Sequence, residues 1–292
     1  MHTGLYTAII TPFRDGKIDE EVFCNLIDEQ IKAGVNGIVP GGTTGESPTL
    51  SKAEHIELIK LAVKHANGRI EVIAGTGSNA TSEAIYLTQC AEDLGISGSM
   101  QVTPYYNKPN QEGIFQHMSA VASATNLPIM LYSVPGRSVV PIEVETAVRL
   151  AEEHSNIVSI KEAGGCVGRV IALRKALPAN FSILCGDDPL TLPFIAAGAD
   201  GLVSVSSNIA PQQILEMVQA CKSGDLKQAR ELFYNILPLT DTLMTIAGNP
   251  LPIKEACAIA GKCSDEFRLP LTNLPPDKKS QIRELLETFS II

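Results

Sequence analysis

The stretch that decides the fold is IVSIKEAGG, residues 157–165. It begins with a short apolar run containing three β-branched residues, which is typical of a buried strand. A glycine-rich turn follows, and residues 167–176 then show helical periodicity. Strand, turn and helix together form one βα unit.

The same unit recurs along most of the chain. We expect strands at 5–10, 37–40, 71–74, 100–103, 128–132, 157–161, 182–185 and 201–205, each followed by a helix at 19–33, 51–66, 80–94, 111–125, 141–153, 167–176, 188–197 or 211–222. A repeating βα order predicts a parallel sheet, and eight units are what a closed (β/α)8 TIM barrel requires. Ser51 and Glu54 have capping-box spacing, while Pro141 and Pro211 suit first helical turns.

The pattern becomes purely helical after the eighth unit. We expect helices at 225–245, 251–260 and 277–288. The predicted organisation is therefore a catalytic barrel at 1–223 with a C-terminal helical region at 224–292.

Composition narrows the functional classes. The 23 basic and 32 acidic residues give a net charge of −9, and no basic run is present, which argues against nucleic acid or an anionic membrane as partner. No apolar stretch approaches the roughly 20 residues that a membrane helix needs. Seven scattered cysteines without a C-x-x-C pair favour free thiols in a reducing cytoplasm.

Polar side chains gather where the predicted strands end. In TIM barrels the chemistry lies at the C-terminal ends of the strands and in the loops that follow. Reading those positions gives Thr43, Thr44, Tyr105, Tyr106, Tyr132, Arg137, Lys161, Gly186, Asp187 and Val203. These residues are expected to converge on one mouth.

Lys161 is the most informative of them. Burial in a low dielectric favours the neutral amine of a lysine, which is the form that attacks a carbonyl group and makes a Schiff base. Two simpler interpretations remain open from the residues alone: the side chain reaches solvent from the strand end, or it pairs with Glu162.

Other motifs are weaker evidence for a particular function. Residues 41–47, GGTTGES, can form a nest of N–H groups for a carboxylate, or merely a capped turn. Residues 75–80, GTGSNA, imitate a dinucleotide fingerprint but leave Lys161 and Arg137 unexplained. Asp187 and Asp188 are interpreted as a helix N-cap. The histidines lack metal-ligand spacing, so no metal is expected.

Together these strings resemble the pyruvate-dependent class I aldolase superfamily, most closely the 4-hydroxy-tetrahydrodipicolinate synthase (dihydrodipicolinate synthase) family. The resemblance spans nearly the whole chain and is carried by GTTGE at 42–46, YSVPGR at 132–137, IKEA at 160–163 and GDD at 186–188. It implies a lyase that condenses pyruvate with L-aspartate 4-semialdehyde in the biosynthesis of lysine and diaminopimelate. It implies no cofactor.

The resemblance also implies residue roles. Lys161 forms the Schiff base, and Tyr132, Thr43 and Tyr106 form a proton relay, with Tyr106 supplied by a neighbouring subunit. Thr44 holds the pyruvate carboxylate, Val203 and Gly186 belong to the same pocket, and Arg137 receives the carboxylate of the semialdehyde. A homotetramer, a dimer of dimers, is the family expectation.

A lysine feedback site of some family members matches at Ser47, His55, Asn79, Glu83 and Tyr105. Pro48 and Lys52 depart from the usual pattern, and a cation at Lys52 would repel the ammonium group of a bound lysine. The alternatives are a sister enzyme, N-acetylneuraminate lyase or a keto-deoxy sugar-acid aldolase, and an idle barrel used for binding. Arg137 argues against the first and the retained Lys161 against the second.

Overall fold

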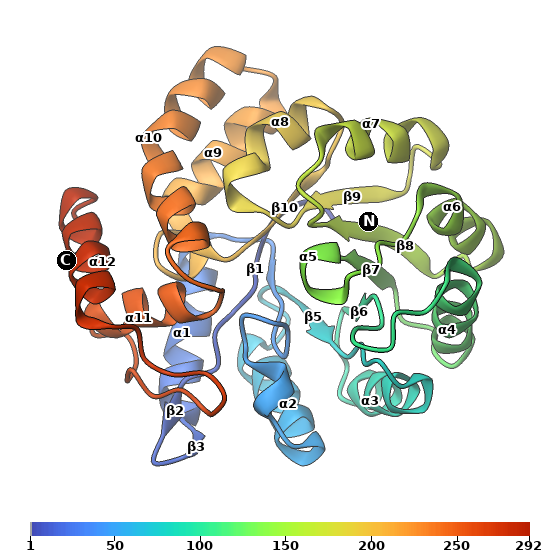
Figure 1. Cartoon of the computed structure of the whole chain (residues 1–292), viewed down its shortest axis with the longest axis horizontal. Coiled ribbons are helices and arrows are strands. Elements are labelled where there is room, and N and C mark those ends of the chain that lie inside the picture. The colour runs from blue at the N-terminus through green and yellow to red at the C-terminus, as the bar shows by residue number, and fades with distance from the viewer. Residues whose placement is uncertain (1) are drawn as a thin grey trace.

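Eight parallel strands close into a barrel in this computed structural model, which describes residues 2–292 (Figure 1). The strands pair in the cyclic order β1-β10-β9-β8-β7-β6-β5-β4. Their bounds are β1 Gly4–Thr7, β4 Gly37–Ile38, β5 Glu71–Gly75, β6 Gly98–Val102, β7 Ile129–Ser133, β8 Ile157–Glu162, β9 Ser182–Cys185 and β10 Gly201–Ser204. The predicted TIM barrel is confirmed, with each strand where the apolar runs indicated.

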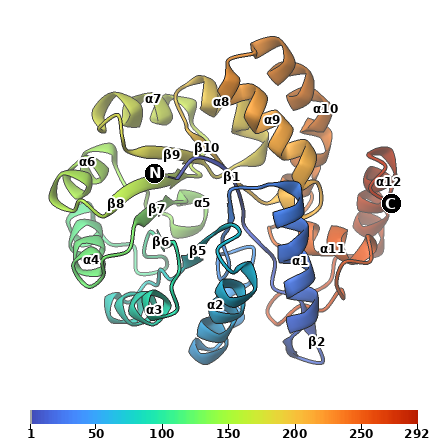
Figure 2. The same cartoon turned by 180° about the vertical axis from the view of Figure 1, so that it is seen from behind.

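Helices surround the barrel, as the two opposite views show (Figures 1 and 2). They are α1 Glu20–Ala33, α2 Lys52–Ala66, α3 Thr81–Asp93, α4 Gln111–Ser123, α6 Val144–Glu153, α7 Val167–Ala176, α8 Thr191–Ala196 and α9 Pro211–Ser223. The capping box of α2 forms as predicted, with Ser51 and Glu54 each accepting from the other's backbone N–H.

Three further helices follow the barrel: α10 Leu226–Thr245, α11 Leu251–Ile259 and α12 Pro276–Thr288. Helix α10 packs on α9, and α11 packs on α12. They lie along one side of the barrel (Figure 1). Helix α9 ends at Ser223, and Gly224 takes the left-handed conformation at φ 81°; the division of the chain at residue 223 stays a prediction.

Several short elements were not predicted from the sequence. These are the hairpin of β2 Phe13–Arg14 and β3 Lys17–Ile18, the four-residue helix α5 Pro135–Ser138, and the 3-10 turns η1 Ser47–Thr49, η2 Asp188–Leu190 and η3 Ser206–Asn208. Pro141 was wrongly placed in a first helical turn. Gln111 donates to the Pro141 carbonyl and accepts from the Glu143 N–H, so that segment stays extended and α6 begins at Val144.

Two apolar clusters hold the architecture. The larger fills the space between the strands and the helices, and the C-terminal helices share it through residues such as Ile253 and Leu286. The smaller fills the barrel interior and includes Tyr6, Met130, Tyr132, Leu184 and Val203. A TIM barrel interior is a packed core, so any open site must lie above it, at the strand ends.

None of the helices in residues 2–292 has both the length and the apolar character that a membrane crossing needs.

Candidate active site

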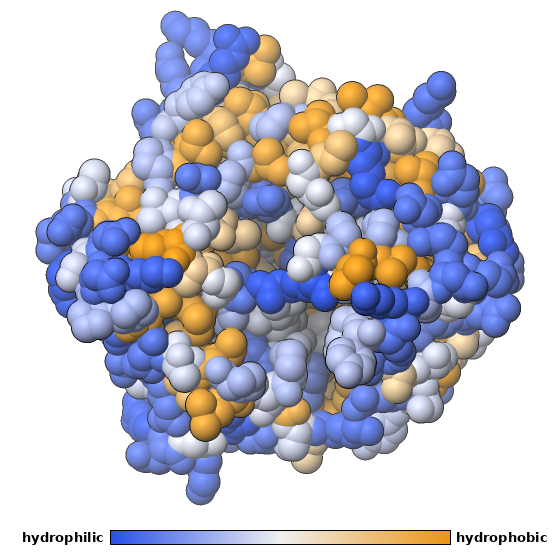
Figure 3. Space-filling view, viewed as in Figure 1, coloured by the Kyte–Doolittle hydropathy of each residue, from blue (hydrophilic) through white to orange (hydrophobic). Residues whose placement is uncertain are grey.

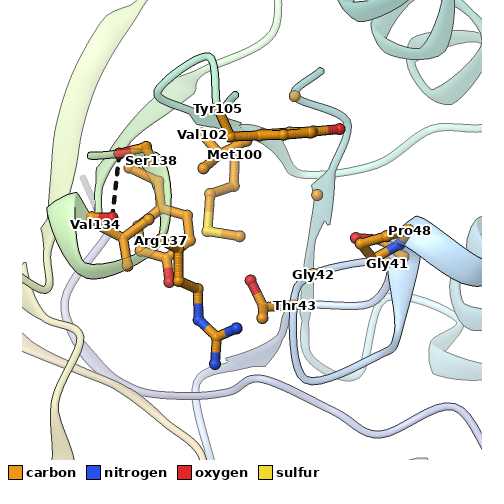
Figure 4. A pocket seen from close by; sticks show the side chains of 14 residues that line it. Gly41, Gly42, Thr43, Pro48, Met100, Val102, Tyr105, Val134, Arg137 and Ser138 are labelled. Carbon is orange, nitrogen blue, oxygen red and sulfur yellow. Dashed lines mark hydrogen bonds between the residues drawn. The ribbon is translucent and has the colours of Figure 1, made fainter. Parts of the chain in front are cut away.

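Two adjoining cavities open above the packed interior, at the C-terminal ends of the strands. The inner cavity is lined by Lys161, Thr44, Gly186, Asp187 and Asn249, among others. The outer one extends to Ser47, Pro48, Gly77 and Tyr105, and both share Thr43, Tyr132 and Arg137. Figure 3 shows this face hollowed near its centre, and Figure 4 shows the outer cavity from close by.

Lys161 lies inside the barrel mouth. Its register partners on the neighbouring strands are Tyr132 and Leu184, both members of the interior cluster, so its side chain shares their face. The residue is 5% exposed, and its Nζ lies 4.3 Å from the centre of the Tyr132 ring. Exposure to solvent from the strand end is therefore excluded.

Pairing of Lys161 with Glu162 is excluded as well. Successive residues on a strand point to opposite faces, and Glu162 faces away from the interior. Its carboxylate accepts from Arg169 Nε at 2.7 Å and from the Gly164 N–H at 2.8 Å. Burial raises the pKa of the Glu162 carboxyl, and Arg169 opposes that shift. The side chains of Lys161 and Glu162 therefore lie in separate environments, on opposite faces of β8.

Gly186 leaves room for the lysine side chain. A Cβ at this position would lie 2.9 Å from Lys161 Cε and 2.8 Å from Ala163 Cβ, closer than real Cβ contacts come. Any side chain here would push Lys161 aside. Gly186 therefore shapes the cavity by having no side chain.

The turn after β4 presents two hydroxyl groups. Thr43 lines both cavities, and Thr44, 3% exposed, accepts from Asn249 Nδ2 at 3.0 Å. The turn depends on unusual backbone at Glu46, whose φ of 56° is uncommon for a residue other than glycine. The fully buried Lys254 ammonium holds the Glu46 carboxylate at 2.5 Å.

Arg137 faces this turn from the opposite wall. It lies on α5, directly after β7, and its Nη2 donates to the carbonyl of Asn249 at 2.8 Å. Its guanidinium points across the cavity toward Thr43 (Figure 4). A cation on a short rigid helix at the cavity wall can receive a carboxylate.

Tyr106 and Val203 do not join these residues within one chain. Tyr106 is 91% exposed, at a φ of 72°, and lines neither cavity. Val203 is fully buried in the barrel interior, and Val205 lines the inner cavity instead. Val205 lies two residues further along the chain than Val203, just beyond the C-terminal end of β10, and so it reaches the opening.

The five residues of the expected feedback site do not all line the outer cavity. Ser47 and Tyr105 line it, and Asn79 donates to the Tyr105 carbonyl at 3.2 Å. His55 is turned toward the Gly75 carbonyl at 2.7 Å, and burial lowers its pKa. Lys52 Nζ lies 3.1 Å from the Glu83 carboxylate. Hydrogen bonds from Ser78 and then Lys52 lower the pKa of Glu83.

Asp188 does not cap its own helix, contrary to the N-cap interpretation. Its carboxylate accepts from the Val205 N–H at 2.8 Å, from the Ser206 N–H and from the Ser204 hydroxyl, so it supports the turn after β10. Asp187 occupies the cap position without a side-chain cap bond and lines the inner cavity instead. Burial raises the pKa of both carboxyls.

Asn249 was missed by the sequence patterns. It lies between α10 and α11, in a region predicted to be an appendage, and no local motif marks it. Only its tertiary position brings it into contact with Thr44 and Arg137. In residues 2–292, no group of three or more His, Cys, Asp and Glu side chains is arranged as metal ligands.

The model of the Dihydrodipicolinate synthetase family matches residues 1–289. This chain belongs to that family. It is 48% identical over 281 residues to the 4-hydroxy-tetrahydrodipicolinate synthase of Leptospira biflexa, covering 96% of this chain and 95% of the relative.

Solved structures of the dihydrodipicolinate synthetase family have the same fold as this chain. The crystal structure of dihydrodipicolinate synthase from Aquifex aeolicus superposes with a TM-score of 0.98 at 44% identity, covering 99% of each chain. A structure described as the first monomeric dihydrodipicolinate synthase variant has a TM-score of 0.97 at 37% identity, covering 99% of this chain and 97% of that one.

Proposed function

We propose that this chain is a lyase that condenses pyruvate with L-aspartate 4-semialdehyde to give 4-hydroxy-tetrahydrodipicolinate, in lysine and diaminopimelate biosynthesis. The observation that carries the proposal is Lys161, buried at the barrel mouth against the Tyr132 ring. Membership of the dihydrodipicolinate synthetase family supports the choice of both substrates.

The reaction begins at the lysine. Lys161 Nζ attacks the ketone carbon of pyruvate, and loss of water leaves an imine that withdraws electrons from the adjacent methyl group. Loss of a methyl proton then gives an enamine, whose carbon attacks the aldehyde of the second substrate. The amino group of that substrate finally displaces Lys161 from the imine carbon, which closes the ring and restores the free lysine.

Each of these steps moves a proton. We assign the relay to Tyr132 and Thr43, which line both cavities and share the inner one with Lys161. Positioned general acids and bases of this kind typically contribute about 10²–10⁴-fold. Tyr106 completes the relay from a neighbouring subunit, and its 91% exposure in one chain supports that assignment.

The carboxylates of the two substrates bind to different residues. Thr44 holds that of pyruvate beside Lys161, with Gly186 leaving space, while Arg137 holds that of the semialdehyde. Val203 supports the pocket floor from below and Val205 meets the substrate. The alternative acceptors, sugar aldehydes such as N-acetylmannosamine, offer no carboxylate for Arg137.

We further propose a homotetramer, a dimer of dimers, working in the cytoplasm without a cofactor. The relay through Tyr106 requires at least a dimer, although the monomeric relative shows that this fold exists in a single chain. All seven cysteines are free, as a reducing compartment favours.

Borohydride trapping tests the function. Incubation with pyruvate and borohydride is expected to add one pyruvate-derived group per chain, on Lys161, and Lys161→Ala should lose it. Arg137→Ala is the matched control, because it should keep the adduct while losing turnover of aspartate semialdehyde. An adduct on another lysine, or faster turnover with N-acetylmannosamine, would contradict the proposal.

A further inference from the structure

One residue that has no role in the proposed function contacts both Thr44 and Arg137, which are proposed to bind the two substrate carboxylates. Asn249 donates its side-chain amide to the Thr44 hydroxyl at 3.0 Å, and its main-chain carbonyl accepts from Arg137 Nη2 at 2.8 Å. Thr44 comes from the turn after β4 and Arg137 from α5. Asn249 thus joins opposite walls of the inner cavity, which it also lines.

The bond to Thr44 is what orients the Asn249 side chain. Within residues 2–292 its Oδ1 is buried and has no hydrogen-bond partner, so the amide is held through Nδ2 alone. A buried unpaired acceptor destabilises the folded state, and it persists only where neighbouring contacts fix the group. A change at Thr44 therefore reaches Asn249 directly.

The same segment is anchored a second time. Five residues further on, Lys254 forms the fully buried ion pair with Glu46, two residues beyond Thr44 on the same turn. The Lys254 ammonium also lies 4.2 Å from the centre of the Phe13 ring. The segment from Asn249 to Lys254 and the Thr43–Thr44 turn are therefore held as one body, against which the Arg137 guanidinium docks.

We propose that Asn249 is a positioning residue that couples the two substrate sites, so that the state of the Thr44 hydroxyl sets the position of the Arg137 guanidinium. This inference rests on the proposed function. Its consequence is that Thr44, which touches only pyruvate, also influences the binding of aspartate semialdehyde, and does so through Asn249.

The experiment is a double-mutant cycle read out as KM for each substrate. Thr44→Val removes the hydroxyl and keeps the shape, and it should raise the KM for aspartate semialdehyde by about three- to tenfold, the range expected for losing one hydrogen bond. In the Asn249→Ala background the same change should alter that KM by less than about twofold. A merely structural role of Asn249 would leave the effect of Thr44→Val the same in both backgrounds.

Two variants serve as controls. Asn249→Asp should retain the coupling, because a carboxylate can still accept from the Thr44 hydroxyl, so Thr44→Val should raise the KM for aspartate semialdehyde in that background as it does in the wild type. If Asn249→Ala fails to fold, Asn249→Leu replaces it, because leucine keeps the size of the side chain but cannot hydrogen-bond to Thr44. Thr49→Val removes a hydroxyl from the same turn whose bond is to the Glu46 carbonyl, and its effect should not depend on Asn249.

The outcomes separate the inference from the function. If the wild-type protein forms no Lys161 adduct or does not turn over aspartate semialdehyde, the proposed function fails. If it does both, but Thr44→Val leaves the KM for aspartate semialdehyde unchanged or raises it equally in both Asn249 backgrounds, the coupling is overturned and the function stands.

Discussion

At the scale of single residues, the site depends on how closely the Lys161 side chain is packed. Tyr132 lies on one side of it, and Gly186 approaches it so closely that a Cβ would collide with Cε. The reach of Nζ into the cavity is therefore set by its neighbours. Small changes next to the lysine should affect chemistry more than folding.

Gly186→Ala tests this idea. The added methyl group should displace Lys161 and lower the rate of borohydride-trapped adduct formation by at least about tenfold, because misplacing a reacting group by about 1 Å can cost about 100-fold. Gly136→Ala is the control, because a Cβ there meets no atom within 4 Å. Equal rates for both variants would mean that Lys161 has more freedom than its contacts indicate.

We expect the response to L-lysine to depend on one residue, Lys52. Lys52 already supplies an ammonium group to the Glu83 carboxylate, so a free lysine at the expected feedback site would meet a neutralised acid and a repelling cation. We expect weak or no inhibition of the wild-type enzyme by L-lysine in initial-rate assays. Lys52→Ala should increase inhibition, whereas Lys60→Ala, which removes an exposed cation paired with Glu57 on the same helix, should not.

At the scale of elements, a buried ion pair joins Lys254 of α11 to Glu46, on the same turn as Thr43 and Thr44. Removing one partner of such a pair typically costs about 3–5 kcal/mol, because the other charge stays buried. Lys254→Met and Glu46→Gln should each lower the free energy of unfolding by about that amount. The double variant should lose much less than the sum of the two, since no uncompensated charge remains.

Urea denaturation monitored by circular dichroism measures these changes. Lys60→Met supplies the comparison, because the exposed Lys60–Glu57 pair should contribute less than about 1 kcal/mol. Additive losses at Glu46 and Lys254 would show that the two charges do not stabilise each other.

The elements were predictable from sequence to very different degrees. The strand at 182–185 was placed with its observed bounds, because an apolar run between turn residues is a local signal. The start of α6 was missed because Gln111, some thirty residues earlier, holds the preceding segment extended. Asn249 was missed for the same reason: its partners Thr44 and Arg137 are distant in sequence.

The positions of single residues were also predictable where a local string marks them and not where they depend on the folded structure. The exposed Tyr106 and the buried Lys161 were recognisable as candidate site residues from their local strings. The placement of Val205 rather than Val203 at the opening depends on where β10 ends, and the local sequence does not fix that end to within two residues.

At the scale of the whole molecule, we expect the buried His2 to make the stability of the fold sensitive to acid. His2 Nδ1 and the Ser159 hydroxyl are hydrogen-bonded at 2.8 Å, and the ring packs edge-on against Tyr6. Burial lowers the pKa of His2 to about 4, with Glu71 opposing the shift. Between pH 6.5 and about pH 4, the His2 side chain is therefore protonated in the unfolded chain and neutral in the folded chain. The free energy of unfolding falls as the pH falls through that window, because the unfolded chain binds more protons.

A shift of that size corresponds to about 3 kcal/mol. Urea denaturation at pH 7.5 and pH 4.5 should show a smaller loss of stability in His2→Gln than in the wild type, because glutamine does not titrate. His65→Gln is the control, since that imidazole is partly exposed and pairs with Asp28. The same acid-induced loss in His2→Gln and wild type would assign the sensitivity to other groups.

Assembly decides whether the proposed relay is complete. Tyr106→Phe should lower turnover, and Lys161→Ala should abolish it. If Tyr106 acts across an interface, a mixed dimer of the two variants contains one intact site: its lysine comes from the Tyr106→Phe chain and its tyrosine from the Lys161→Ala chain. Co-refolding the two should therefore raise activity per Tyr106→Phe chain toward the wild-type value. Activity that stays at the level of Tyr106→Phe alone, or sedimentation showing a fully active monomer, would place the whole relay within one chain.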